Sequence, residues 1–218
     1  MFHKATSVAV AAERIPDGAT LLIGGFMGVG SPHRLIDELV RQGRKNLTVI
    51  ANDTALPGTG IGKLIAVKAI SKLITTHIGL NPETQRQMIA GETEVELVPQ
   101  GTLAERIRSG GFGLGGVLTP TGVGTLAADG KRTVEIEGKV FLLELPIKAD
   151  FALIGCHRAD YQGNLQYALT ARNFNPIMAM AGDTVIAEPT EIVPVGEISP
   201  DHVVTPHVLV DLLIEKGQ

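Results

Sequence analysis

Short runs of uninterrupted apolar residues alternate along this chain with segments whose apolar residues recur at helical spacing. Residues 20–23 form one such run and residues 47–51 form the next. Between them, a segment that Pro32 opens carries an apolar stripe on one helical face, at Leu35, Ile36, Leu39 and Val40. Strands buried on both faces have few polar residues, whereas the helices that cover them are amphipathic. The alternation therefore predicts an α/β fold, an open and mostly parallel sheet with helices on both faces.

The remaining segments continue this pattern with one interruption. We expect a helix that begins at Pro82 with Asn81 as its N-cap, helices at residues 61–70 and 102–108, and strands at residues 72–78, 95–98, 149–155, 184–187 and 208–214. Residues 133–145 instead alternate apolar and charged side chains around Gly138, which predicts an inserted β-hairpin. Because no linker divides the chain, residues 1–218 are expected to form a single domain.

The charge and hydropathy of the chain exclude two classes of partner. The formal net charge is -4, and no run of basic residues offers a nucleic acid the cations that it would need. The apolar stretches fall short of the roughly 20 residues that span a membrane, and the first residues lack the apolar core of a secretory signal. We therefore expect a cytoplasmic protein that binds neither nucleic acid nor membrane.

The cysteine and histidine residues do not indicate a redox or metal site. Cys156 is the only cysteine, so no internal disulfide is possible, and its apolar neighbours indicate a thiol packed in a buried strand. No histidine pair has helical ligand spacing with a catalytic glutamate. His202 and His207 could bind zinc, but surface or capping roles fit these two residues better. We therefore expect no metal and no permanently bound cofactor.

Four loops follow predicted strands and should meet along one edge of the sheet, at residues 24–30, 51–62, 78–82 and 99–101. In open α/β sheets, ligands bind outside the carboxyl ends of the strands. The first of these loops reads Gly24, Gly25, Phe26, Met27, Gly28, Val29 and Gly30. Glycines allow backbone N–H groups to approach a ligand closely, and the helix after Pro32 adds a partial positive charge at its start. The loop is predicted to bind an anionic or extended ligand; the alternative is a tight turn that binds nothing.

Gln100 is the candidate polar group at this edge. It follows the predicted strand at residues 95–98 and precedes Gly101, so it should project from a strand end. A neutral amide in that place can donate a hydrogen bond to a developing oxyanion without transferring a proton. The alternative is a turn residue whose amide bonds to the backbone.

A dinucleotide-binding fingerprint also occurs, at residues 111–116. The motif has to leave a strand and open a helix. Here it follows the predicted helix at residues 102–108, and Pro120 prevents a simple helical continuation. We therefore interpret these glycines as a flexible or closely packed loop, and expect no nicotinamide dinucleotide.

Four blocks spread over nearly the whole chain are distinctive, at residues 17–32, 99–108, 119–125 and 171–176. These blocks, and their order, resemble the alpha subunit of family I, or 3-oxoacid type, CoA-transferases. Residues 52–62 are more similar to the acetate/acetoacetate type than to the 3-oxoadipate type. The resemblance implies the fold that CoA-transferases share with glucosamine-phosphate deaminases.

The resemblance also implies a reaction and a partner. Family members move CoA, as a substrate carrier, from an acyl-CoA to short-chain carboxylates such as acetate, acetoacetate or butyrate. A glutamate first forms an acyl anhydride and then a glutamyl-CoA thioester. In the family this glutamate lies in a Glu-Asn-Gly motif of the beta subunit, and the triplet is absent from this chain. A beta-subunit partner, in a heterotetramer of two alpha and two beta subunits, is therefore implied.

Site residues carry over from the same resemblance. Gln100 matches the family glutamine that helps to stabilise the oxyanion, residues 24–30 match the loop assigned to CoA binding, and Asn52 falls in a loop expected to line the acyl pocket. Three alternatives stay open. They are a 3-oxoadipate or succinyl-CoA type transferase, a sugar-phosphate isomerase or deaminase for which Asp53 and His77 would be the nearest acid/base groups, and a non-catalytic binding subunit.

Overall fold

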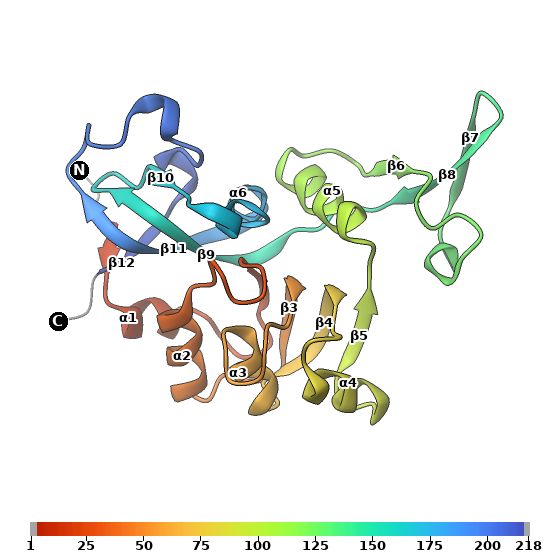
Figure 1. The fold of residues 1–218 in the computed structure, drawn as a ribbon, viewed down its shortest axis with the longest axis horizontal. Helices are drawn as coiled ribbons and strands as arrows, with labels where there is room; N and C mark the ends of the chain where they lie inside the picture. The colour runs from red at the N-terminus through yellow and green to blue at the C-terminus, as the bar shows by residue number, and fades with distance from the viewer. Residues whose placement is uncertain (1–3, 216–218) are drawn as a thin grey trace.

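The computed structural model describes residues 4–215, and a wide sheet organises them (Figure 1). Within these residues the main sheet has nine strands: eight follow the order β1-β12-β11-β9-β2-β3-β4-β5, and β10 pairs with β9. All pairs along that order are parallel, whereas β10 is antiparallel to β9. This confirms the predicted mostly parallel sheet. Its strands are Ala5–Thr6 (β1), Thr20–Ile23 (β2), Leu47–Asp53 (β3), Ile70–His77 (β4), Glu94–Leu97 (β5), Ala149–Asp160 (β9), Leu165–Gln166 (β10), Gly182–Val193 (β11) and Leu212–Ile214 (β12).

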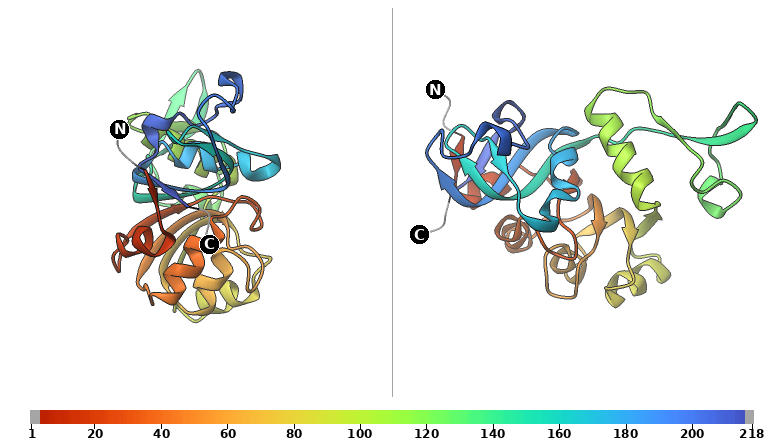
Figure 2. Two further views of the ribbon diagram at one scale, coloured as in Figure 1. Left: turned by 90° about the vertical axis from the view of Figure 1, so that its left-hand side faces the viewer. Right: turned by 45° about the horizontal axis from the view of Figure 1, so that its top comes forward.

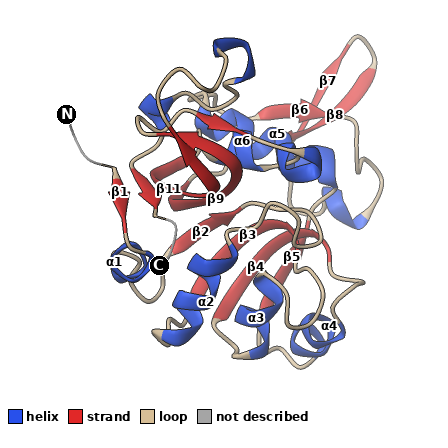
Figure 3. Ribbon diagram, turned by 60° about the vertical axis from the view of Figure 1, so that its left-hand side comes forward, coloured by secondary structure: helices blue, strands red, loops and turns tan. Residues whose placement is uncertain are grey.

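Helices cover both faces of this sheet, as predicted (Figure 3). Alternate residues of β2 enter different cores, because successive side chains of a strand point to opposite faces. Leu21 and Ile23 pack in the core under α1, α2 and α3, whereas Leu22 packs in the core under α5 and α6. The helices are Val8–Glu13 (α1), His33–Arg41 (α2), Ile61–Ala66 (α3), Pro82–Ile89 (α4), Gln100–Gly111 (α5) and Asn175–Met178 (α6), with short 3-10 helices at Leu126–Ala128, Leu169–Arg172, Pro200–His202 and His207–Leu209.

The strand order reverses between β2 and β9. The chain proceeds outward from β2 through β3, β4 and β5, and β9 then returns to pair with the other side of β2. In an open α/β sheet, such a reversal leaves a crevice at the carboxyl ends of the two strands. The glycine-rich loop follows β2 and therefore lies at this point of the sheet.

Helix α4 begins as predicted, and helix α3 is shorter than predicted. Asn81 caps α4, since its side-chain oxygen accepts from the backbone N–H of Glu83 at 3.2 Å. The expected helix at residues 61–70 ends at Ala66 instead. Lys68 adopts a φ of 54°, a left-handed conformation that closes the helix before β4 begins.

The expected strand at residues 208–214 was also too long. Pro206 precedes a 3-10 helix, and only the last three residues of the segment form β12 beside β11. Proline cannot donate a ladder hydrogen bond, so it favours a turn at this place. Helix α5, by contrast, begins earlier than predicted, at Gln100 in place of Thr102.

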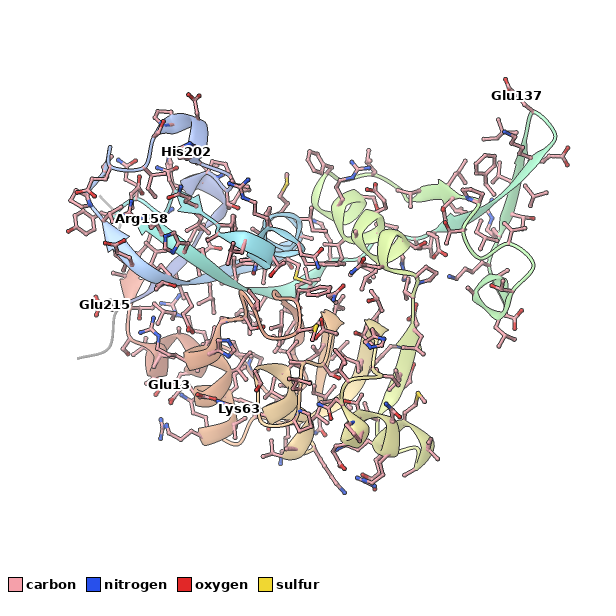
Figure 4. All side chains as sticks on the ribbon, viewed as in Figure 1. Glu13, Lys63, Glu137, Arg158, His202 and Glu215 are labelled. Carbon is pink, nitrogen blue, oxygen red and sulfur yellow. The ribbon has the colours of Figure 1, made fainter. Side chains whose placement is uncertain are left out.

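The predicted hairpin is confirmed and belongs to a larger unit. β7 (Thr133–Ile136) and β8 (Lys139–Glu144) are antiparallel, and the turn residues Glu137 and Gly138 have φ of 51° and 74°, as two-residue hairpin turns require. β6 (Val117–Thr119) adds a third strand beside β8. This sheet, which we call the arm, extends away from the main sheet (Figure 2), with Glu137 at its tip (Figure 4).

Glycines let the loop after β2 pack directly against β9 and α6. A Cβ on Gly155 of β9 would lie 2.2 Å from the backbone oxygen of Gly30. A Cβ on Gly24 would lie 1.7 Å from Asn175 Oδ1. The Asn175 side chain fills this space: it accepts from the Gly155 N–H at 3.1 Å and donates to the Gly30 and Ala171 carbonyls at 3.0 and 2.9 Å. Asn175 therefore joins the base of the loop to β9.

Cys156 follows Gly155 in β9 and is 6% exposed. Burial, with a smaller contribution from the nearby Glu188 carboxylate, raises the pKa of the Cys156 thiol far above its usual range. The sequence prediction of a packed thiol is therefore confirmed.

We predict that Gly155→Ala destabilises the chain by about 1–3 kcal/mol, the usual cost of inserting a methyl group into a packed interior. Urea unfolding measures this loss. Gly115→Ala is the matched control, because no atom beyond its chain neighbours lies within 4 Å of the added Cβ. Equal unfolding free energies for the two variants would contradict the close approach of the loop to β9.

We also predict that Cys156 reacts slowly with a chromogenic disulfide reagent in the native protein at mildly alkaline pH. The thiolate is the reactive species, and burial suppresses it. Adding urea should expose the thiol and increase the rate of labelling. Rapid labelling of the native chain would contradict the packing of this strand.

Candidate functional site

Hydrogen bonds join the loop after β2, the carboxyl end of β3 and the start of α5. Asn52, expected in a loop, lies instead in β3, of which Asn52 and Asp53 are the last two residues. Asp53 Oδ2 accepts from the backbone N–H of Met27 at 2.9 Å and from Asn52 Nδ2 at 2.7 Å. Asn52 Oδ1 in turn accepts from Gln100 Nε2 at 2.5 Å. We call Met27, Asp53, Asn52 and Gln100 the rim network. The predicted site residues Gln100 and Asn52 thus meet at one edge of the sheet, together with the tip of the glycine-rich loop.

Asn52 is firmly anchored within this network. It is 2% exposed, and its backbone carbonyl accepts from Thr75 Oγ1 at 3.0 Å and from Thr76 Oγ1 at 2.7 Å. Gln100 is exposed and is the first residue of α5. The exposed Gln100 side chain therefore bonds to the buried Asn52 amide, whose position the two threonine hydrogen bonds fix.

The glycine-rich loop forms a tight hairpin turn. Phe26 and Val29 exchange two backbone hydrogen bonds, each 2.9 Å long. The two residues between them, Met27 and Gly28, have φ of 50° and 87°. The ring Nε2 of His33 is hydrogen-bonded to the Gly28 carbonyl at 2.9 Å. The turn is therefore held in place from both the Asp53 side and the His33 side, and Met27 and Val29 are exposed at its tip.

An internal carboxylate occupies the N-terminus of α2. Glu188 of β11 accepts from the backbone N–H groups of Arg34 at 3.0 Å and Leu35 at 2.8 Å, and it lies 3.5 Å from Arg34 Nε. We expected the positive end of this helix to attract an anionic ligand. The structure shows instead that Glu188 satisfies these first-turn amides and offsets their partial charge.

A cavity of about 640 Å³ lies beside the start of α2. Its walls come from the glycine-rich loop, α2, β9, β11 and the segment before α6. Val29 and Gly30 line this cavity, whereas Met27 contacts the rim network. The hairpin turn thus contributes both to the cavity and to the rim network. The volume of the cavity is in the size range of small-molecule sites.

Sequence reasoning missed several residues that shape this region. Glu188 and Asn175 hold the glycine-rich loop and α2, yet each bonds to groups more than a hundred residues away. A charged residue inside the apolar run of β11 was the available signal for Glu188. His33 gave no signal, because its role depends on the fold of the turn.

Two features are absent from residues 4–215. None of their His, Cys, Asp and Glu side chains form a group of three that could hold a metal ion. No helix in this part of the chain has the length and apolar character needed to cross a membrane.

Comparison with known proteins identifies related chains. The family model described as coenzyme A transferase matches residues 5–216. The alpha subunit of the acetate CoA-transferase of Escherichia coli K12 is 57% identical over 91% of this chain and 90% of its own. The alpha subunit of the acetoacetyl-CoA:acetate/butyrate CoA transferase of Clostridium acetobutylicum is 51% identical over 92% of each chain. One subunit of the 3-oxoadipate CoA-transferase of Acinetobacter baylyi is 46% identical over 96% of this chain and 93% of its own.

A solved structure has the same fold. It is an acyl-CoA transferase of Escherichia coli O157:H7 in a thioester complex with CoA, with a TM-score of 0.88 and 22% sequence identity. The match covers 98% of this chain and 47% of that chain, so this chain spans about half the length of the solved protein. The family match across residues 5–216 and the 57% identity to a relative of similar length show that this chain belongs to the coenzyme A transferase family.

Proposed function

We propose that this chain is the alpha subunit of an acyl-CoA:carboxylate CoA-transferase that moves CoA between short-chain acids. The relatives named for acetate and for acetate/butyrate are 57% and 51% identical to it. The observation that carries the proposal is the hydrogen bond from Gln100 to Asn52, since it holds a neutral amide donor beside a preformed glycine turn. A 3-oxoadipate type transferase is the second candidate, supported by 46% identity to such a relative.

In the proposed reaction, the companion beta subunit supplies a glutamate carboxylate, which attacks the carbonyl carbon of the acyl-CoA. The carbonyl oxygen becomes an oxyanion, the C–S bond breaks, and the CoA thiolate leaves an acyl-glutamyl anhydride. The thiolate then attacks the glutamyl carbonyl, which releases the first carboxylate and forms a glutamyl-CoA thioester. A second carboxylate collects CoA by the reverse sequence. Because water takes no part, the thioester energy is kept.

Gln100 is proposed to donate to the oxyanion in these steps. One hydrogen of Nε2 goes to Asn52, which leaves the second hydrogen for the reacting oxygen. An amide suits this role because it stabilises negative charge without giving up a proton. We place CoA along the turn at residues 24–30 and the acyl group beside Asn52.

The companion subunit is proposed to cover the rim network and part of the arm. Several large apolar residues of the arm and its junctions are exposed, among them Leu126 at 88% and Leu145 at 61%. Stable partners usually bury more than about 2,000 Å² together, and covering such residues would contribute to that area. We propose a heterotetramer of two alpha and two beta subunits in the cytoplasm, with CoA as a substrate and no permanently bound cofactor.

We expect this chain to be inactive alone and to transfer CoA from acetoacetyl-CoA to acetate once the companion subunit is added. The expectation follows from the missing Glu-Asn-Gly nucleophile. Thioester consumption measured with and without the companion is the test, with butyrate and 3-oxoadipate as further acceptors. Full transferase activity of the chain alone would contradict the proposal, and preference for 3-oxoadipate would favour the second candidate.

In the assembled enzyme, Gln100→Ala should lower kcat by roughly 10²–10³, the usual effect of removing one oxyanion-hole donor. Steady-state kinetics on acetoacetyl-CoA and acetate give this value. Gln162→Ala is the matched control, because Gln162 is an exposed glutamine in the turn after β9. An unchanged kcat for Gln100→Ala would show that its amide does not serve the reaction.

A further inference from the structure

The Asp53 carboxylate accepts three hydrogen bonds, and two of them join different parts of the site. Its carboxylate accepts from the backbone N–H of Ala55 at 2.7 Å on Oδ1, and from Met27 N–H and Asn52 Nδ2 on Oδ2. Asp53 is only 6% exposed. The bond to Ala55 alone would make an ordinary Asx turn after β3. The two bonds on Oδ2 reach the tip of the glycine turn and the next residue of the rim network.

A carboxylate fixes the direction of the amides that follow it. An ionised carboxylate only accepts, whereas each amide side chain has a donor end and an acceptor end. Asn52 must therefore turn Nδ2 toward Asp53, which leaves Oδ1 toward Gln100. Gln100 must in turn present Nε2 to that oxygen, at 2.5 Å.

We propose that Asp53 is a positioning residue that sets which edge of the Gln100 amide faces the substrate, acting through Asn52. The same carboxylate oxygen holds the Met27 N–H, so the orientation of Gln100 and the position of the glycine turn share one anchor. The proposal deepens the proposed function, in which Gln100 must act as a donor. Asp53 takes no proton in this role and does not touch the substrate.

Replacing the carboxylate by an amide of the same shape changes both bonds on Oδ2, to Asn52 and to the Met27 N–H. In Asp53→Asn the side-chain oxygen can keep the Ala55 bond, and the new NH₂ group then faces Asn52. Asn52 relieves the conflict between two donors by reversing its amide. Gln100 then meets a donor in place of an acceptor, reverses as well, and presents its oxygen where its nitrogen was.

The orientation can be followed by NMR in the assembled complex, with this chain labelled at the glutamine side-chain nitrogens. The Gln100 resonance is identified by its absence in Gln100→Ala. Asp53→Asn should shift this resonance and speed its hydrogen exchange. Asp37→Asn is the matched control, because Asp37 forms a surface ion pair with Lys63, and it should leave the resonance unmoved. If Asp53→Asn does not assemble, Asn52→Ala cuts the same connection and should also shift it. An unmoved Gln100 resonance overturns the proposal.

Kinetics test whether Asp53 acts through Gln100. We expect Asp53→Asn to lower kcat by roughly 10²–10³, as Gln100→Ala does, because both remove the amide donor. In a Gln100→Ala background it should lower kcat less than about twofold, because the effects of residues that act as one unit are not additive. If the two single variants lower kcat independently, so that their fold-losses multiply in the double variant, the proposal is overturned. A shifted Gln100 resonance with kcat unchanged in both single variants would support the positioning role and would instead refute the proposed function of Gln100.

Discussion

The close approach of the loop after β2 to β9 is the constraint on which the site depends. Gly24, Gly30 and Gly155 leave room for no side chain at this crossing, and Asn175 bonds across the space that they create. Protein interiors are packed densely enough that one added methyl group has to displace its neighbours. The hairpin turn at the tip of the loop can therefore hold one position relative to the ends of β3 and β5.

Two carboxylates hold the glycine-rich loop and the start of α2 by accepting hydrogen bonds from backbone amides. Asp53 anchors the tip of the glycine turn on one side, and Glu188 anchors the first turn of α2 on the other. Charge-assisted hydrogen bonds of this kind are stronger than neutral ones. These two acidic groups thus have structural roles, which agrees with the proposal that the nucleophile comes from a companion chain.

The arm has little of its own interior. Leu142 is fully buried, whereas many other apolar residues of the arm and its junctions are exposed. Three strands need a hydrophobic face, or packing against a helix, to be stable on their own. The exposed apolar residues of the arm fit a surface that the proposed companion subunit covers.

Hydrophobic periodicity and turn residues are local signals, and they were enough to predict the layers, the long central strands and the edge of the sheet where Gln100 and Asn52 lie. The short strands β1, β6 and β10 were not predicted. Local signals also placed the Asn81 cap and the hairpin at Gly138. The strand order, with β9 beside β2, could be read only from the folded chain. The same holds for Glu188 at the start of α2 and for the connection that Asp53 makes between the glycine turn and Gln100. These contacts join residues far apart in the chain, so their geometry exists only once the sheet has formed.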